Sequence, residues 1–255
     1  MSAVEALCIL LAGVAAGTIN TIVGSGTLIT FPTLLFFGYP PVVANVSNTV
    51  GLVAGGVTGV HGYRRELRGS QDTLRRLVPM SLLGSVIGAL LLLVLPPEAF
   101  AAIVPALIGL GLVLVVLGPR LQSAASARHS DAVVPWHQPV MMAGVFVAGI
   151  YGGYFGAAQG VILIGLLSAL SSEPLQRLNG YKNVLGTVVN AVAALTFMAV
   201  AWDRVDWPAA GLVALGALAG GYLGSTFGRR LPAAALRAFI IVIGVVAITK
   251  MVWFP

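Results

Sequence analysis

The sequence has 255 residues, of which 58% are hydrophobic and only 9% charged, with a mean hydropathy of +0.98 and a formal net charge of +6. Because soluble globular proteins carry about 25% charged residues, these values exclude a soluble enzyme, a nucleic-acid-binding domain and a disulfide-stabilised scaffold. They indicate a polytopic membrane protein, in which basic residues lie in short loops and set the orientation of the helices rather than bind nucleic acid.

Ten apolar runs predict an all-α protein. In chain order they cover residues 4–23, 27–37, 41–62, 77–95, 98–118, 138–157, 161–170, 174–201, 208–228 and 233–253. Most reach the roughly 20 residues that a membrane-spanning helix needs, whereas the runs 27–37 and 161–170 are too short. Each short run follows a glycine-rich break, at 20–26 and at 152–160. We therefore expect re-entrant or broken helices near the midplane of the bilayer.

The order of long and short runs repeats along the chain. Pro40 matches Pro174, residues 45–50 match 179–184, and a glycine pair with a following proline recurs as Gly84, Gly88 and Pro96 and as Gly220, Gly224 and Pro232. Internal duplication of this kind is common in transporters. It predicts a first transmembrane repeat at 1–118, a cytoplasmic linker at 119–137 and a second repeat at 138–255, each repeat with about five helical segments.

The distribution of basic residues favours repeats of inverted orientation. If each half crosses the membrane an odd number of times, Arg204 and Lys250 are the only two of the 14 basic residues placed outside. Parallel repeats would place nine of them inside, so the positive-inside rule prefers inversion with both termini outside. The residues that then lie on or toward the cytoplasmic side are Arg64, Arg65, Arg68, Arg75, Arg76, Arg120, Arg128, Arg177, Lys182, Arg229, Arg230 and Arg237.

Polar residues recur on one face of two matching helices. After Pro41, the residues Asn45, Asn48 and Thr49 follow the spacing i, i+3, i+4, and in the second half Asn179, Lys182, Asn183 and Asn190 follow the same face. Lys182 lies roughly 12 Å in from the start of its helix, too deep to reach the membrane surface. Amides at depth also serve as interhelical hydrogen-bonding groups, an alternative that stays open for Asn45, Asn179 and Asn190. A buried cation without a matching carboxylate in its helix suits an anionic ligand.

The glycine-rich breaks strengthen the hypothesis of an anion site. A half-helix that starts inside the membrane directs unpaired N–H groups and a positive dipole end toward the interior. Close helix packing is the alternative role for the glycines. No His, Cys, Asp or Glu cluster has metal-ligand spacing, and we expect no cofactor and no catalytic residues. The predicted substrate site comprises Asn20, Thr21, Ser25, Gly26, Thr27, Asn48, Thr49, Tyr151, Gln159, Gly160, Lys182 and Asn183.

Several motifs cover both halves of the chain: residues 16–26, Phe31-Pro32, Pro41, 44–50, 179–184, 205–207 and 220–224. Together these motifs resemble those of the sulfite exporter TauE/SafE family. One departure is Ser25, where the family often has glycine. The resemblance implies a bacterial inner-membrane permease, usually an exporter, for small sulfur-containing anions such as sulfite, thiosulfate and sulfonates including sulfoacetate.

The combined expectation is a multi-pass transporter that alternates access around an anion site near the midplane. Its expected partners are the anion and the lipid bilayer, with a homo-oligomer as a further option. A passive anion channel and a non-transporting membrane subunit are the alternatives. The sequence leaves the anion, the direction and the energy coupling open. Lys182→Ala is expected to abolish anion binding and to leave the protein folded.

Overall fold

The computed structural model describes residues 1–127, 137–228 and 233–253, and within these ranges the chain is helical without strands. Linker residues 128–136, which include Arg128, and the positions of Arg229 and Arg230 lie outside the described residues. The helices are α1 (Ala3–Ile22), α2 (Thr27–Phe36), α3 (Pro41–Gly62), α4 (Gln71–Val94), α5 (Pro97–Ala127), α6 (His137–Tyr154), α7 (Gln159–Leu170), α8 (Leu175–Val200), η1 (Trp202–Arg204), α9 (Trp207–Phe227) and α10 (Ala233–Trp253).

The length and composition of these helices fit a multi-pass membrane protein. Within the described residues, six helices are long and apolar enough to cross a bilayer: α1, α3, α4, α5, α8 and α9. The shorter α2 and α7 have 10 and 12 residues. At about 1.5 Å per residue, each covers only about half of a hydrocarbon core roughly 30 Å thick.

Local sequence signals explain where several helices begin. Ser2 and Glu5 form a reciprocal capping box at the start of α1. The Asp206 carboxylate accepts a hydrogen bond from the Ala209 N–H at 2.9 Å and caps α9. Pro40 and Pro174 precede α3 and α8 with the same backbone angles, φ −56° and ψ 141°. The matched prolines therefore start matched helices.

Two helices extend beyond their apolar runs. Helix α4 begins at Gln71 rather than at 77, because a polar first turn containing Asp72 extends the helix beyond its apolar run. Helix α5 continues through Pro119 to Ala127, so the first part of the predicted linker is helical. Proline is tolerated inside such a helix where neighbouring groups satisfy the freed carbonyl, and the alanine-rich sequence that follows has high helix propensity.

The two halves of the chain interlock. The main contacts that helices of the first half make with the second half have equivalents in the reverse direction. Helices α1 and α3 pack on α9, and α6 and α8 pack on α4. In the same way, α2 packs on α10 and α7 packs on α5. The central contact joins α3 to α8. These equivalent contacts are consistent with two related repeats, and the inverted relation between them stays a prediction.

Close glycine contacts match α4 to α9, but one helical turn away from the match that the sequence suggests. A Cβ atom on Gly84 would lie 2.3 Å from the Phe146 carbonyl oxygen, and one on Gly216 would lie 2.3 Å from the Leu10 carbonyl oxygen. Gly84 in α4 therefore has its counterpart at Gly216 in α9, one helical turn before the predicted Gly220. The packing role of these glycines, which lets the backbones approach, agrees with their small-residue spacing.

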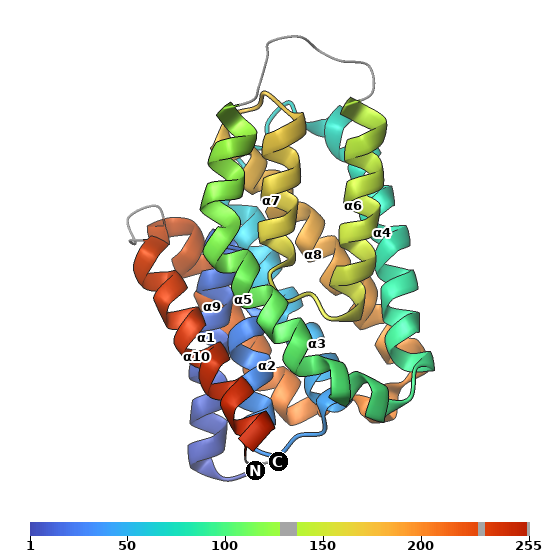
Figure 1. Ribbon diagram of the computed structural model, residues 1–255, viewed down its shortest axis with the longest axis vertical. Helices are drawn as coiled ribbons and strands as arrows, with labels where there is room; N and C mark the ends of the chain where they lie inside the picture. Colours follow the sequence, from blue (N-terminus) through green and yellow to red (C-terminus); the bar gives the residue numbers. More distant parts are fainter. Residues whose placement is uncertain (128–136, 229–232, 254–255) are drawn as a thin grey trace.

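Figure 1 shows where the ends of the helices lie. The start of α1 and the end of α10 are at one end of the molecule, and the end of α5 and the start of α6 are at the other. Helix α6 runs into the interior, and α7 turns back toward the end from which α6 came. The arrangement makes α6 and α7 a helical hairpin whose tip lies inside the protein.

Candidate functional site

The tips of two helical hairpins meet in the interior. The α1–α2 turn contains Gly24, whose φ of +86° is a left-handed conformation that favours glycine. The N–H of Gly160, in the first turn of α7, donates to the Gly24 carbonyl oxygen at 3.0 Å. A Cβ on either glycine would lie 2.4 Å from the Cα of the other. Both positions therefore need glycine for this close backbone contact.

A small cavity lies beside this contact. Its volume is about 20 Å³, enough for about one water molecule. Polar side chains and glycines from four helices and two hairpin turns surround it, and none of the lining residues is a carboxylate. They are Asn20, Gly24, Thr27, Gly156, Gln159, Gly160, Lys182, Asn183, Gly186, Thr187 and Asn190.

Lys182 is the cation of this site, and its side chain is only 2% exposed. Its Nζ donates to the carbonyl oxygens of Thr21 at 2.9 Å, Ile22 at 3.2 Å and Asn20 at 3.5 Å. These carbonyls belong to the last turn of α1, where unpaired C=O groups carry partial negative charge. No carboxylate within the described residues forms an ion pair with Lys182. The lysine thus joins α8 of the second half to α1 of the first.

This geometry changes the expected effect of removing the lysine. An ammonium has three N–H donors, and here all three have carbonyl partners. Lys182→Ala would leave the end of α1 without these partners inside the protein. The prediction that this variant remains fully folded therefore does not fit the structure.

Asn183 and Asn48 hold the same region together by amide hydrogen bonds. The Asn183 Nδ2 donates to the carbonyl oxygens of Thr21 at 3.1 Å and Asn179 at 2.9 Å. The fully buried Asn48 accepts a hydrogen bond from the Thr30 hydroxyl, and its Nδ2 lies 3.4 Å from the Thr27 hydroxyl oxygen. Asn48 therefore fixes α2 against α3 behind the cavity wall.

The structure brings six of the twelve predicted site residues to the cavity wall: Asn20, Thr27, Gln159, Gly160, Lys182 and Asn183. The other six support the wall or lie away from it: Thr21, Ser25, Gly26, Asn48, Thr49 and Tyr151. The Tyr151 hydroxyl, for example, donates to the Ala157 carbonyl oxygen at 2.6 Å. Ser25 is fully buried, and its hydroxyl has no hydrogen-bond partner among the described residues.

Three lining residues of α8 were missed by the predicted site: Gly186, Thr187 and Asn190. They follow Lys182 and Asn183 at steps of three and four residues, so they extend the same helix face. That periodicity could have identified them. A Cβ on Gly186 would meet no atom within 4 Å, which shows that this position opens onto free space.

The hydrogen bonds already made determine which donors could reach a ligand. Lys182 and Asn183 use their N–H groups on backbone carbonyls, and the Thr187 hydroxyl donates to the Asn183 carbonyl oxygen at 2.6 Å. The Asn20 side chain accepts from the Gly26 N–H at 3.4 Å, which leaves its NH₂ group available. Asn190 makes no hydrogen bond through its side chain to another described residue. Asn20 and Asn190 are therefore the amides on the wall whose NH₂ groups donate to no other described residue, and the Gln159 NH₂ group, which donates once to the Ala148 carbonyl oxygen at 3.1 Å, has one further N–H.

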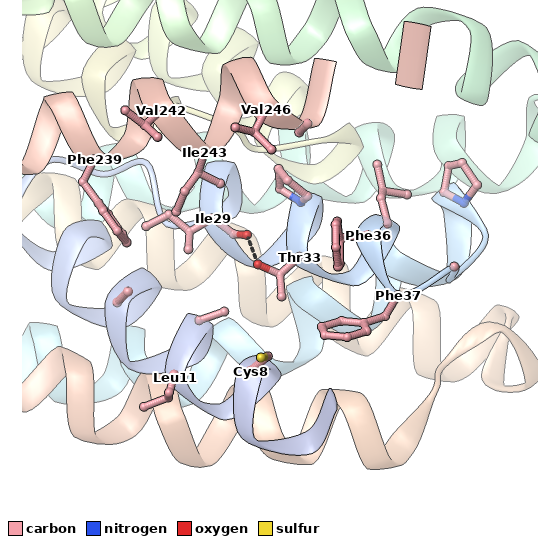
Figure 2. Close-up of a pocket in the computed structure, with 17 residues that line it drawn as sticks. Cys8, Leu11, Ile29, Thr33, Phe36, Phe37, Phe239, Val242, Ile243 and Val246 are labelled. Carbon is pink, nitrogen blue, oxygen red and sulfur yellow. Dashed lines mark hydrogen bonds between the residues drawn. The ribbon is translucent and has the colours of Figure 1, made fainter. Parts of the chain in front are cut away.

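A second and larger cavity lies elsewhere and has a different character. Figure 2 shows this groove of about 850 Å³ between α1, α2 and α10. Phe36, Val242 and Val246 on its wall are more than half exposed. The Thr33 hydroxyl in this groove donates to the Ile29 carbonyl oxygen at 2.7 Å, so it offers no free proton. Hydrocarbon suits such a surface, and a small oxyanion does not.

No group of three or more His, Cys, Asp or Glu residues that could hold a metal ion occurs in the part of the chain that the structure describes. The polar cavity at the hairpin tips, with buried Lys182 on its wall, is the candidate functional site.

Comparison with known proteins places this architecture among membrane transporters. Residues 9–251 match the family described as Sulfite exporter TauE/SafE. The chain is 26% identical over 245 residues to the "Probable membrane transporter protein ORF9" of Sinorhizobium sp., covering 94% of this chain and 89% of that protein. It is 26% identical over 243 residues to the "Probable membrane transporter protein YfcA" of Escherichia coli K12, covering 93% and 86%. No solved structure matches the chain significantly.

Proposed function

The chain belongs to the sulfite exporter TauE/SafE family of membrane transporters, and on this premise we propose that it exports a small sulfur-containing anion across the bacterial inner membrane. Sulfite, thiosulfate and sulfonates such as sulfoacetate are the proposed substrate class. The proposed orientation has both termini outside. The anion binds at the cavity between the hairpin tips, and one half of the protein rocks against the other to open the site to each side in turn.

The proposal rests on the groups that line the cavity at the hairpin tips. The cavity at the hairpin tips has a buried ammonium and several amides on its wall, and no carboxylate among its lining residues. Buried charge inside a membrane protein is costly and usually serves a ligand or a partner. The positive starts of α2 and α7 point to the same cavity and add to the favourable potential for an anion.

The proposal assigns different roles to the cation and the amides. Lys182 supplies positive potential from the edge of the cavity while its N–H groups bind the end of α1. Direct hydrogen bonds to the anion come from Asn20 and Asn190, whose NH₂ groups remain available. An oxyanion can accept these bonds on separate oxygen atoms, so two amides on different helices can bind it together.

Transport by purified protein in liposomes tests the proposal. Uptake of labelled sulfite, thiosulfate and sulfoacetate is compared with uptake of sulfate, taurine and acetate. Asn190→Ala should lower the transport rate at least tenfold. Asn179→Ala is the matched control, because it removes the same amide from the same helix outside the cavity. Equal rates in the two variants, or no transport of any sulfur anion by a folded protein, would contradict the proposal.

A passive anion channel is the second candidate. The same liposome assay distinguishes it from a carrier. The cavity of about 20 Å³ has space for about one water molecule, whereas a channel needs a continuous polar path. A carrier should show saturable uptake and exchange of external label against internal unlabelled anion. Flux that neither saturates nor shows exchange would favour the channel.

A further inference from the structure

The end of α1 forms a cradle of three carbonyl oxygens, those of Asn20, Thr21 and Ile22, around a single nitrogen atom. The nitrogen is Nζ of Lys182, which comes from a helix about 160 positions away in the sequence. The Thr21 carbonyl also accepts a hydrogen bond from Asn183. The last turn of α1 contains no basic residue of its own.

Such a cradle has the chemistry of a monovalent cation site. Carbonyl oxygens at the end of an interrupted helix replace the hydration shell of a small cation, and the helix dipole adds negative potential. The two shorter distances, 2.9 and 3.2 Å, match hydrogen bonds from an ammonium rather than direct contacts to a hard ion such as Na⁺. Within the described residues, no carboxylate pairs with Lys182, so the partial negative charges on the carbonyl oxygens are what stabilise its ammonium group.

We propose that the end of α1 is a monovalent cation site whose resident cation is the ammonium of Lys182. The covalently attached cation holds the tip of the α1–α2 hairpin against α8, so this contact needs no free alkali ion. The inference goes beyond the proposed substrate, because it concerns a cation site and holds whichever anion is carried. It also predicts that the empty cradle of a variant accepts a free ammonium ion.

Chemical rescue of Lys182→Ala tests the inference. The protein in detergent is unfolded by heat at constant chloride with choline, Na⁺, ammonium or methylammonium as the cation, and without any sulfur anion. The wild type should show the same Tm in all four salts. Lys182→Ala should melt several degrees lower in choline chloride. Ammonium or methylammonium should then raise its Tm in proportion to the logarithm of concentration, as a ligand of the folded state does.

Two further variants control the experiment. Asn183→Ala removes a hydrogen bond to the Thr21 carbonyl while the ammonium stays in place, so its loss of Tm should not respond to any cation. Lys182→Met keeps much of the side-chain volume and removes the charge, so it should be less stable than the wild type and unresponsive to ammonium.

Three results would overturn the inference. They are a Lys182→Ala protein that is folded and indifferent to ammonium and methylammonium, a Lys182→Met protein as stable as the wild type, and an Asn183→Ala protein rescued equally well by ammonium. The Lys182→Met result decides the matter if Lys182→Ala does not fold. The Tm measurement needs no transported anion. A negative result here therefore does not contradict the proposed function, and a failure of transport does not contradict the cation site.

Discussion

Replacing Gly186 by alanine should stabilise the protein and stop transport. Gly186 lies within α8 and lines the cavity at the hairpin tips, and a Cβ added there would meet no atom within 4 Å. The substitution therefore creates no clash, and alanine is favoured over glycine inside a helix by about 1 kcal/mol. For a chain of this size, that gain corresponds to a rise in Tm of about 2–4 °C.

The same methyl group occupies the space in which the anion is proposed to bind. The cavity of about 20 Å³ holds about one water molecule, so a methyl group takes most of it. We expect the rate of anion uptake into liposomes to fall at least tenfold. This combination of higher stability with lost transport separates an effect on the site from an effect on folding.

Gly165→Ala is the matched control for this variant. Gly165 lies within α7, its added Cβ would also meet no atom within 4 Å, and it does not line the cavity. It should give a similar rise in Tm and leave transport unchanged. If Gly186→Ala transports the anion as fast as Gly165→Ala does, the cavity is not the binding site and the proposed mechanism fails.

Three further predictions concern the contact between the hairpin tips, the hydrogen bonds between α2 and α3, and the tyrosine between α2 and α3. Gly160→Ala should lower the free energy of unfolding by about 1–3 kcal/mol in chemical denaturation, because its methyl group would overlap Gly24 across the hairpin contact; an unchanged value would show that the tips do not touch. Asn48→Ala should cost about 1–3 kcal/mol in the same measurement, since it removes the amide that bonds the buried hydroxyls of Thr27 and Thr30 on α2, and a neutral result would contradict this role. Burial, and then a 2.9 Å hydrogen bond to Glu5, raise the pKa of Tyr39 above its ordinary value of 10.0, so its contribution to stability is present below pH 10 and lost as the pH rises further. Tyr39→Phe should therefore flatten the fall of Tm above pH 10, and parallel curves for the two proteins would refute the assignment.

Most of the helical framework could be predicted because its signals are local. The length of each apolar run, the prolines before α3 and α8 and the glycines at the two breaks all act within a few residues of the boundary that they set. The helices that are longer than their apolar runs also have local causes. The polar first turn of α4 and the continuation of α5 through Pro119 extend helices beyond the apolar runs used to define them.

The candidate site was predictable only in part. The polar face of α8 marked Lys182, Asn183 and Asn190, although Asn190 was not included in the predicted site, and the same periodicity extends to Gly186. By contrast, no periodicity assigns Asn48 to the support of α2 or Tyr151 to the hairpin turn. Whether a polar group faces a cavity or a neighbouring helix depends on how the helices pack. The identity of a residue at one position does not indicate its neighbours in the tertiary structure.

By itself, the sequence determined that this is a multi-pass helical membrane protein, that its halves repeat the same order of segments, and that one buried cation lies among amides. Apolar length, glycine and proline positions and helical spacing carry this information along the chain. Only the tertiary structure decided that Lys182 binds the end of α1 and that Gly24 meets Gly160. These contacts join residues more than 130 positions apart, and they exist only because two hairpins enter the protein to the same depth and pack tip to tip.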